Sequence, residues 1–315
     1  MRRVTSAFFR SILSPATSTP CRIQSWTDCP RRQLWQEAQK KSNSSPDKSP
    51  YLHNAGLVSY LEPMNHGLFF CLAALILGLP TAAAETLTVA VASNFSRPAQ
   101  ELASRYEEAT GQAVRITTGS TGKLYAQISN GAPFDILLAA DSARPVLLEE
   151  SGLGVAGSRF TYAIGGLTLW SLDTEFADLD CRAALNDLGR HRLAIANPET
   201  APYGAAAKQF LQSAQLWDKV APHLVYGENI AQTLQFVASG NASLGLIAQS
   251  QARDGRLPEA TCQWPVPKDS HSALEQQAIL LRRAEDVAGA VEFLGFLRGP
   301  VAHDVISSHG YSVAE

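Results

Sequence analysis

From Thr86 onward, short apolar runs alternate with segments of helical periodicity, and this alternation is the feature that most restricts the fold. The run "TLTVAVA" is typical of a buried strand. After it, Ala99, Leu102 and Tyr106 recur at the spacing of one helical face. The same order of strand, loop and helix repeats toward the C-terminus. Strands that alternate with helices predict an α/β protein with helices packed on the faces of its sheets.

The first group of predicted elements ends at two adjacent glycines, Gly165 and Gly166. Strands are expected at 86–92, 113–118, 134–140 and 161–172, and helices after Ser96 and after Gly122. Ser96 or Asn94 is expected to cap the first helix, and Gly111 to end it. Because glycines inside a strand pattern indicate a bend, the paired glycines are predicted to form a hinge.

A second group of elements repeats the pattern. Strands are expected at 192–196, 224–227, 242–248 and 276–281, with helices around Phe210, Leu234 and Phe293. The chain has 315 residues and is 45% hydrophobic, which is enough for two cores. We predict an α/β fold of two lobes, residues 85–165 with 266–315 and residues 166–265, joined by a hinge and separated by a ligand cleft.

Residues 1–63 show no sustained helical or strand period. Nine of the chain's 26 Lys and Arg residues lie in this segment, against four of its 29 Asp and Glu residues. The chain has two methionines, Met1 and Met64, and the second stands where an export signal would begin. We predict that residues 1–63 are an N-terminal extension, either non-native through a wrong start-site assignment or disordered. A basic leader followed by an internal membrane anchor is the alternative.

Residues 64–84 have the organisation of a secretory signal peptide. The apolar run from Leu68 to Leu79 has the length of its hydrophobic region, and Pro80 and the small residues 82–84 follow as at a cleavage site. The run is shorter than the roughly 20 apolar residues of a membrane-spanning helix. Although the segment lacks Lys and Arg, it predicts export to the periplasm and a mature protein that begins near Glu85.

The chain is acidic after residue 84. With 17 Lys and Arg residues against 25 Asp and Glu residues, residues 85–315 carry a formal net charge of −8. Because the phosphates of nucleic acids select basic surfaces, this balance argues against a nucleic-acid partner.

Two cysteines, Cys181 and Cys262, remain after the predicted signal peptide. In an oxidising compartment they either form a disulfide or stay as two thiols, and the sequence leaves both possibilities open because it does not give their distance in space. Motifs with the spacing of metal ligands, such as CxxC or HExxH, are absent from the sequence.

The segment "TTGSTGKLYAQI" has the appearance of a nucleotide phosphate loop but lacks two of its parts. A Walker A loop has a glycine five residues before its Gly-Lys pair, and a Ser or Thr directly after the lysine to hold Mg²⁺. Here these positions hold Thr117 and Leu124. The loop is therefore predicted to offer backbone N–H groups and hydroxyls at the start of a helix rather than to bind ATP.

Four loops that join a strand to a helix carry small or hydroxyl residues: Ser93-Asn94, Gly119–Gly122, Pro202–Gly204 and Asn229-Ile230. Each taken alone is explained as a helix cap. Together, at the carboxyl ends of strands, they are expected to present helix N-termini to one anion. Hydrogen bonds to a charged group contribute about 1.5–3 kcal/mol each, so six to eight converging donors would hold a small oxyanion without Lys or Arg.

Five motifs identify a resemblance to a known family. They are "VAVASNF", "GSTGKLYAQISNGAPFDILLAAD", "LAIANPETAPYGAAAKQFL", "GENIAQTLQFVASGNASLGLIA" and "PVPKDSH", in this order. From Thr86 to the C-terminus the chain resembles the periplasmic molybdate-binding proteins of ABC transporters. The resemblance implies a type II periplasmic-binding-protein fold that closes on molybdate or tungstate, and it implies delivery to the permease and ATPase subunits of an ABC importer.

The resemblance also implies a ligand site for molybdate. The family's positions fall on Ser93, Asn94, Ser120, Thr121, Tyr203 and Ile230, with Ile230 contributing its backbone N–H. Which of Ser120 and Thr121 gives the side-chain hydrogen bond is open by one position. Molybdenum would be held as its oxyanion, without direct protein–metal ligands and without a cofactor. A tyrosine that some members carry is replaced by Ala248, and Tyr203 is expected to supply that donor from the other side of the cleft.

The main expectation is thus a monomeric binding protein and not an enzyme. A receptor for sulfate or phosphate is the first alternative, because pocket radius is not given by sequence and because Glu199 and Glu228 lie close in sequence to the loops. The second is an enzyme on a two-lobed scaffold, or a nucleotide-binding protein that uses Lys123. Catalysis would need a nucleophile or base with a partner, and the sequence offers no such set.

Overall fold

The structure is a computed structural model that describes residues 86–177, 180–285 and 287–313. The predicted N-terminal extension, residues 1–63, and the predicted signal peptide, residues 64–84, lie outside the described residues. No helix within the described ranges has both the length and the apolar character needed to cross a membrane.

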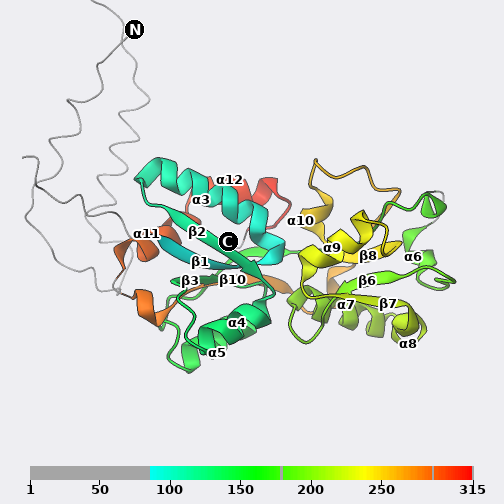
Figure 1. Ribbon diagram of the computed structural model, residues 1–315, viewed down its shortest axis with the longest axis horizontal. Coiled ribbons are helices and arrows are strands. Elements are labelled where there is room, and N and C mark those ends of the chain that lie inside the picture. The colour runs from blue at the N-terminus through cyan, green and yellow to red at the C-terminus, as the bar shows by residue number, and fades with distance from the viewer. Residues whose placement is uncertain (1–85, 178–179, 286, 314–315) are drawn as a thin grey trace, which may run out of the picture. The chain divides into compact units, whose positions relative to one another are not determined.

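The described residues build two β-sheets of five strands each, and Figure 1 shows both. The first sheet has the order β2-β1-β3-β10-β4. Its strands are β2 (Val114–Gly119), β1 (Leu87–Ala92), β3 (Ile136–Leu138), β10 (Leu274–Leu280) and β4 (Phe160–Gly165). The strands β2, β1 and β3 are parallel, whereas β10 is antiparallel to both of its neighbours. We call this sheet and the helices that cover it lobe 1.

The second sheet has the order β7-β6-β8-β5-β9 and forms lobe 2 with its helices. Its strands are β7 (Leu224–Gly227), β6 (Leu193–Ala196), β8 (Leu244–Ala248), β5 (Leu167–Ser171) and β9 (Cys262–Pro265). Here β7, β6 and β8 are parallel, and β5 is antiparallel to β8 and β9. Only Gly166 separates β4 of lobe 1 from β5 of lobe 2, so the chain passes between the lobes at the predicted hinge.

Helices cover both faces of each sheet (Figure 1). In lobe 1, α3 (Ser96–Thr110), α11 (Ala288–Leu297) and α12 (Pro300–Ser308) lie on one face, and α4 (Thr121–Ser129) and α5 (Ala143–Glu150) on the other. In lobe 2, α9 (Ile230–Ala238) and α10 (Gln249–Ala252) lie on one face, and α6 (Cys181–Ala184), α7 (Pro202–Ser213) and α8 (Trp217–Val220) on the other. Short 3-10 turns complete the described elements: η2 (Ser93–Phe95), η3 (Thr174–Phe176), η4 (Ala221–His223), η5 (Lys268–Ser270) and η6 (Arg282–Ala284).

The strands of lobe 1 are apolar at successive positions because both faces of the sheet are buried. In β3, Ile136 and Leu138 contribute to the core beneath α3, α11 and α12, while Leu137 contributes to the core beneath α4 and α5. Ile279 of β10 lies in this second core together with Leu124 of α4. The period of two along a strand thus divides each apolar run between two cores. The predicted α/β fold of two lobes is confirmed.

The predicted N-cap of the first long helix is wrong. The helix α3 begins at Ser96, its N-cap is Phe95, and no side chain caps it. The reason is that η2 runs directly into α3, so Ser96 already has helical angles of φ −59° and ψ −39°. At its other end α3 stops as predicted, because Gly111 takes the left-handed conformation with φ 75°.

The cysteines form a disulfide in lobe 2. Cys181 and Cys262 are bonded, with Cα atoms 5.6 Å apart and a sequence separation of 81 residues. The bond fastens α6 to β9, and both cysteines lie in the core beneath α7. Of the two possibilities that the sequence left open, the structure has the disulfide.

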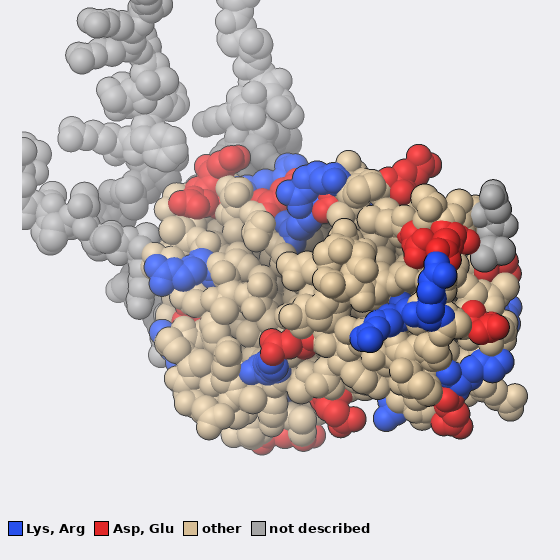
Figure 2. Space-filling model, turned by 45° about the vertical axis from the view of Figure 1, so that its right-hand side comes forward, with Lys and Arg blue, Asp and Glu red and all other residues tan. Residues whose placement is uncertain are grey.

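Charged side chains on the surface are of both signs. On the face that Figure 2 shows, acidic and basic side chains are interspersed, and neither sign covers a broad area. Neighbouring charges of opposite sign also form ion pairs. Four of them are Arg105 with Glu101, Arg144 with Asp141, Arg159 with Glu149 and Arg282 with Glu285.

Candidate anion site between the lobes

All six predicted ligand residues line one small cavity. Its wall contains Ser93, Asn94, Ser120, Thr121, Tyr203 and Ile230, together with Ala92, Gly119, Ala140, Ala201 and Pro202. The cavity volume is about 10 Å³, far below the about 300–1,000 Å³ of pockets for drug-sized ligands. Lobe 1 contributes the loops after β1 and β2, and lobe 2 contributes the starts of α7 and α9. The four loops therefore meet around one narrow space.

The loop after β1 is held from behind by a buried hydrogen-bond network. The side-chain amide of Asn94 donates to Gln276 Oε1 at 2.7 Å and to Tyr311 Oη at 3.0 Å. Tyr311 Oη in turn donates to the Asn94 carbonyl at 2.8 Å and accepts from Ser250 Oγ at 2.9 Å. Since both amide hydrogens of Asn94 are used, its backbone N–H is the donor left for a ligand. Ser93, its neighbour in η2, adds a hydroxyl to the cavity wall.

Ser120 and Thr121 differ in what their hydroxyls do. Thr121 Oγ1 accepts a hydrogen bond from the backbone N–H of Ala140 at 3.0 Å. Ser120 is the N-cap residue of α4, but its hydroxyl makes no capping hydrogen bond. Ser120 Oγ is buried and has no hydrogen-bond partner among the described residues. The Ser120 hydroxyl therefore has all of its hydrogen-bonding capacity available to a ligand in the cavity. The Thr121 hydroxyl accepts from Ala140, which follows β3, and keeps its own O–H as a donor.

The Tyr203 hydroxyl is a second buried polar group without a partner in the described part of the chain. Tyr311 lies close enough that each tyrosine affects the pKa of the other. No hydrogen bond joins them, because one hydrogen and two lone pairs of Tyr311 Oη are already used by Asn94 and Ser250. Burial raises the pKa of Tyr203 well above its ordinary value. The hydroxyl is therefore a neutral donor at physiological pH.

Gly165 makes room for this hydroxyl. A Cβ atom on Gly165 would overlap Tyr203 Oη and lie 3.1 Å from Gln276 Nε2. The hinge glycine thus has a steric role next to the cavity as well as its place between the lobes.

The start of α9 leaves one N–H group for a ligand. Asn229 is the N-cap of α9, and its Oδ1 accepts from the N–H groups of Ala231 and Gln232 at 3.0 and 3.1 Å. Ile230 is the first residue of the helix, and its N–H does not donate to Asn229 Oδ1. The side chain of Ile230 is buried. Since the first N–H groups of a helix lack intrahelical partners, the N–H of Ile230 is a donor at the cavity wall.

Neither cations nor carboxylates belong to the cavity wall, as far as the described residues define it. Lys123 lies outside, where its Nζ is 3.0 Å from Glu228 Oε2, and Glu199 is exposed. The wall therefore consists of hydroxyls, helix-start N–H groups and apolar atoms. This set donates hydrogen bonds and, by the partial positive charge of helix N-termini, favours an anion.

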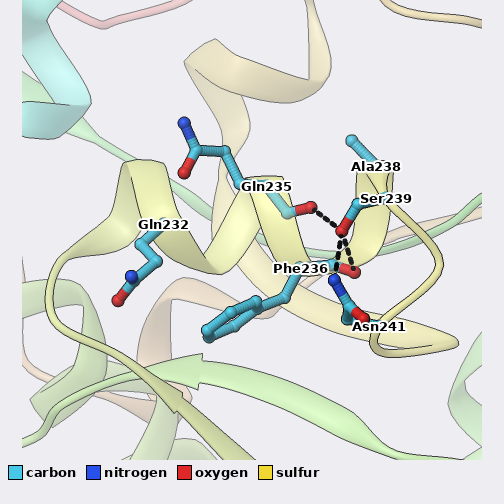
Figure 3. A pocket seen from close by; sticks show the side chains of 6 residues that line it. All are labelled: Gln232, Gln235, Phe236, Ala238, Ser239 and Asn241. Atoms are coloured by element: carbon cyan, nitrogen blue, oxygen red, sulfur yellow. Dashed lines mark hydrogen bonds between the residues drawn. The ribbon is translucent and has the colours of Figure 1, made fainter.

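A second hollow on the surface has different chemistry. It lies along the C-terminal part of α9, and Figure 3 shows its lining of Gln232, Gln235, Phe236, Ala238, Ser239 and Asn241. Ser239 Oγ donates to the Gln235 carbonyl at 2.7 Å and accepts from Asn241 Nδ2 at 2.8 Å. The hollow is open to solvent and holds none of the predicted ligand residues.

Sequence patterns missed Gln276, Ser250 and Tyr311, which support Asn94. They come from β10, from α10 and from the end of the chain, and no local motif connects them. The described residues contain no group of three or more His, Cys, Asp or Glu side chains that could hold a metal ion.

The chain is similar to proteins of a known family. Residues 87–312 match the family described as bacterial extracellular solute-binding protein. The molybdate-binding protein ModA of Azotobacter vinelandii is 44% identical over 253 residues, which are 79% of this chain and 100% of that protein. ModA of Rhodobacter capsulatus is 41% identical over 240 residues, which are 76% of this chain and 93% of that protein.

A solved structure agrees with the sequence relatives. The periplasmic molybdate-binding protein of Azotobacter vinelandii has a TM-score of 0.69 to this chain at 35% identity, over 73% of this chain and 100% of that chain. The predicted periplasmic-binding-protein fold is confirmed by this likeness and by the two sheets. The chain belongs to the bacterial extracellular solute-binding protein family, in which these molybdate-binding proteins are its relatives.

Proposed function

We propose that this chain is an extracytoplasmic receptor that binds molybdate in the cavity between its lobes and delivers it to the permease and ATPase subunits of an ABC importer. The observation that carries the proposal is a pair of buried hydroxyls, Ser120 Oγ and Tyr203 Oη, that line the cavity without a partner among the described residues. Burying a polar group without a hydrogen bond is costly, so a ligand with several acceptor oxygens is the natural partner of both.

The charge of the ligand follows from the donor set. A tetrahedral dianion has only acceptor oxygens, and the wall offers hydroxyls and N–H groups from both lobes. Hydrogen phosphate carries a proton and needs an acceptor. Glu199 is exposed and Glu228 pairs with Lys123, so neither carboxylate serves the cavity. This argues for molybdate, tungstate or sulfate over phosphate, and the ModA relatives favour molybdate among these.

The finer parts of the proposal rest on the sequence. Tungstate, with the same charge and shape, is expected to be a second ligand. Residues 64–84 would direct export to the periplasm, and residues 85–165 with 266–315 and residues 166–265 would be the two lobes of a monomer. Ligand binding would close the lobes, and the closed form would be recognised by the permease. The relatives are binding proteins by name, which supports transport rather than catalysis.

A thermal-shift titration tests the proposal. The purified protein is heated with molybdate, tungstate, sulfate or phosphate, each over a wide concentration range. A ligand at about a thousand times its dissociation constant stabilises the folded state by roughly 4 kcal/mol, which is readily measured. We expect a large shift with molybdate and tungstate and a small one with phosphate. Absence of a molybdate shift would refute the proposal.

A further inference from the structure

A backbone hydrogen bond joins the two lobes beside the cavity. The N–H of Gly122, in the first turn of α4 in lobe 1, donates to the carbonyl oxygen of Thr200 in lobe 2 at 2.9 Å. Gly122 lies two residues after Ser120, and Thr200 lies three residues before Tyr203. The contact therefore connects the two segments that carry the unpartnered hydroxyls.

The two backbones touch so closely that position 122 has no room for a side chain. A Cβ atom on Gly122 would lie 2.8 Å from the Thr200 carbonyl oxygen, 3.0 Å from its Cα and 3.3 Å from its carbonyl carbon. All three are backbone atoms, so they cannot rotate away as the end of a flexible side chain would. The lobes would have to move apart to accept even a methyl group.

Local conformation does not explain this glycine. Gly122 does not have a positive φ, so its backbone conformation does not require glycine. It lies inside helix α4, where alanine has a higher helix propensity than glycine. Within lobe 1 the position would therefore accept alanine. The constraint against a side chain comes from lobe 2.

We propose that the Gly122–Thr200 contact is the stop that sets how closely the lobes approach, and with it the spacing of the donors around the ligand. The inference rests on the proposed function. Since α4 and α7 both begin at this contact, a displacement there moves Ser120 away from Tyr203, and one ligand then no longer reaches both hydroxyls. Gly122 is on this view a positioning residue, which acts on the ligand through lobe closure.

The variant Gly122→Ala tests the stop. We expect its ligand-free melting temperature to equal or exceed that of the unsubstituted protein, while its dissociation constant for molybdate rises about tenfold or more. Small-angle X-ray scattering with saturating molybdate should show less compaction than in the unsubstituted protein. The matched control is Gly255→Ala in lobe 2, because a Cβ there meets nothing within 4 Å. It should keep the original affinity and compaction.

Amide hydrogen exchange on the unsubstituted protein gives a second measurement that does not depend on how the variant folds. Molybdate should slow exchange of the Gly122 N–H, whose acceptor is in the other lobe. The Leu124 N–H should change little, because its acceptor is Ser120 O in the same lobe, at 3.0 Å.

The outcomes separate the two proposals. If the unsubstituted protein fails to bind molybdate, the proposed function fails and the stop fails with it. If that protein binds but Gly122→Ala binds and compacts equally well, the stop alone is wrong. Unchanged exchange of the Gly122 N–H on binding would overturn it as well.

Discussion

Ser250 Oγ of lobe 2 donates a hydrogen bond to Tyr311 Oη of lobe 1 at 2.9 Å, and through this pair the second lobe touches the network that holds Asn94. Replacing Tyr311 by phenylalanine would keep the ring against Phe95, whose centroid is 5.3 Å away, and remove only the hydroxyl. The amide and carbonyl of Asn94 would each lose a buried partner, at a cost of about 1–3 kcal/mol. We expect molybdate affinity to fall about tenfold, as measured by calorimetry.

Ser250→Ala is the control for this prediction. It removes the bond between the lobes but leaves both contacts of Tyr311 with Asn94, so a smaller loss of affinity is expected. Equal affinity of Tyr311→Phe and the unsubstituted protein would show that the network does not support the ligand loop.

The adjacent hydroxyls at the start of α4 should respond in opposite ways. Ser120→Ala removes a hydroxyl that has no hydrogen-bond partner in the described part of the chain. The ligand-free protein should therefore keep or gain stability, while molybdate affinity falls by about 1.5–3 kcal/mol, tenfold or more. Thr121→Val removes the acceptor of the Ala140 N–H and should lower ligand-free stability by about 1–3 kcal/mol. Urea unfolding and calorimetry of both variants give the two quantities. If only Thr121→Val lost affinity, Ser120 would be removed from the site.

Loss of the disulfide should affect stability rather than recognition. Cys181 and Cys262 close a loop with a separation of 81 residues, and bonds of this kind typically stabilise by about 2–4 kcal/mol. The double variant with serine at both positions is expected to unfold at lower temperature by a corresponding amount. Its molybdate affinity should stay within about twofold, because neither cysteine lines the cavity. A large change in affinity with unchanged stability would contradict this assignment.

Alkaline pH should destabilise the fold through buried tyrosines. Burial raises the pKa of Tyr106 and of Tyr311 from 10.0 to about 12. In this interval the folded state keeps phenolic protons that the unfolded state releases, so the free energy of unfolding is unaffected below pH 10 and falls as pH rises from 10 to 12. Urea unfolding at a series of pH values measures the decline. In Tyr106→Phe the free energy of unfolding should fall less steeply between pH 10 and pH 12. An equal slope in this variant and in the unsubstituted protein would argue against a buried phenol at position 106.

Local chemistry explains which parts of the fold were predictable. Gly111, Gly131 and Gly240 each take a positive φ near the end of a helix, as their neighbouring sequence indicates. The helices α5 and α12 and the strand β9 were not predicted. Among the described strands β9 pairs with β5 alone, which is far away in sequence, so its four residues carry no strong pattern of their own.

The six residues predicted as ligands line one cavity, but the hydrogen bonds of each could not be predicted from the sequence. Ser120 and Thr121 differ because the Thr121 hydroxyl accepts from the N–H of Ala140, which follows β3 and lies 19 residues away in the sequence. Within the described residues the Tyr203 hydroxyl has no hydrogen-bond partner, because Ser250 and Asn94 already use Tyr311. Such competition for donors and acceptors is a property of the folded arrangement, and no spacing in the sequence records it.

The position of β10 fixes the order in which the lobes can be completed during synthesis. β10 lies between β3 and β4, so the other four strands of lobe 1 are made before this interior strand, which ends at Leu280. Lobe 2 has its last strand by Pro265. A growing chain can therefore finish the sheet of the second lobe first, while the sheet of the first lobe stays incomplete until β10 has been made.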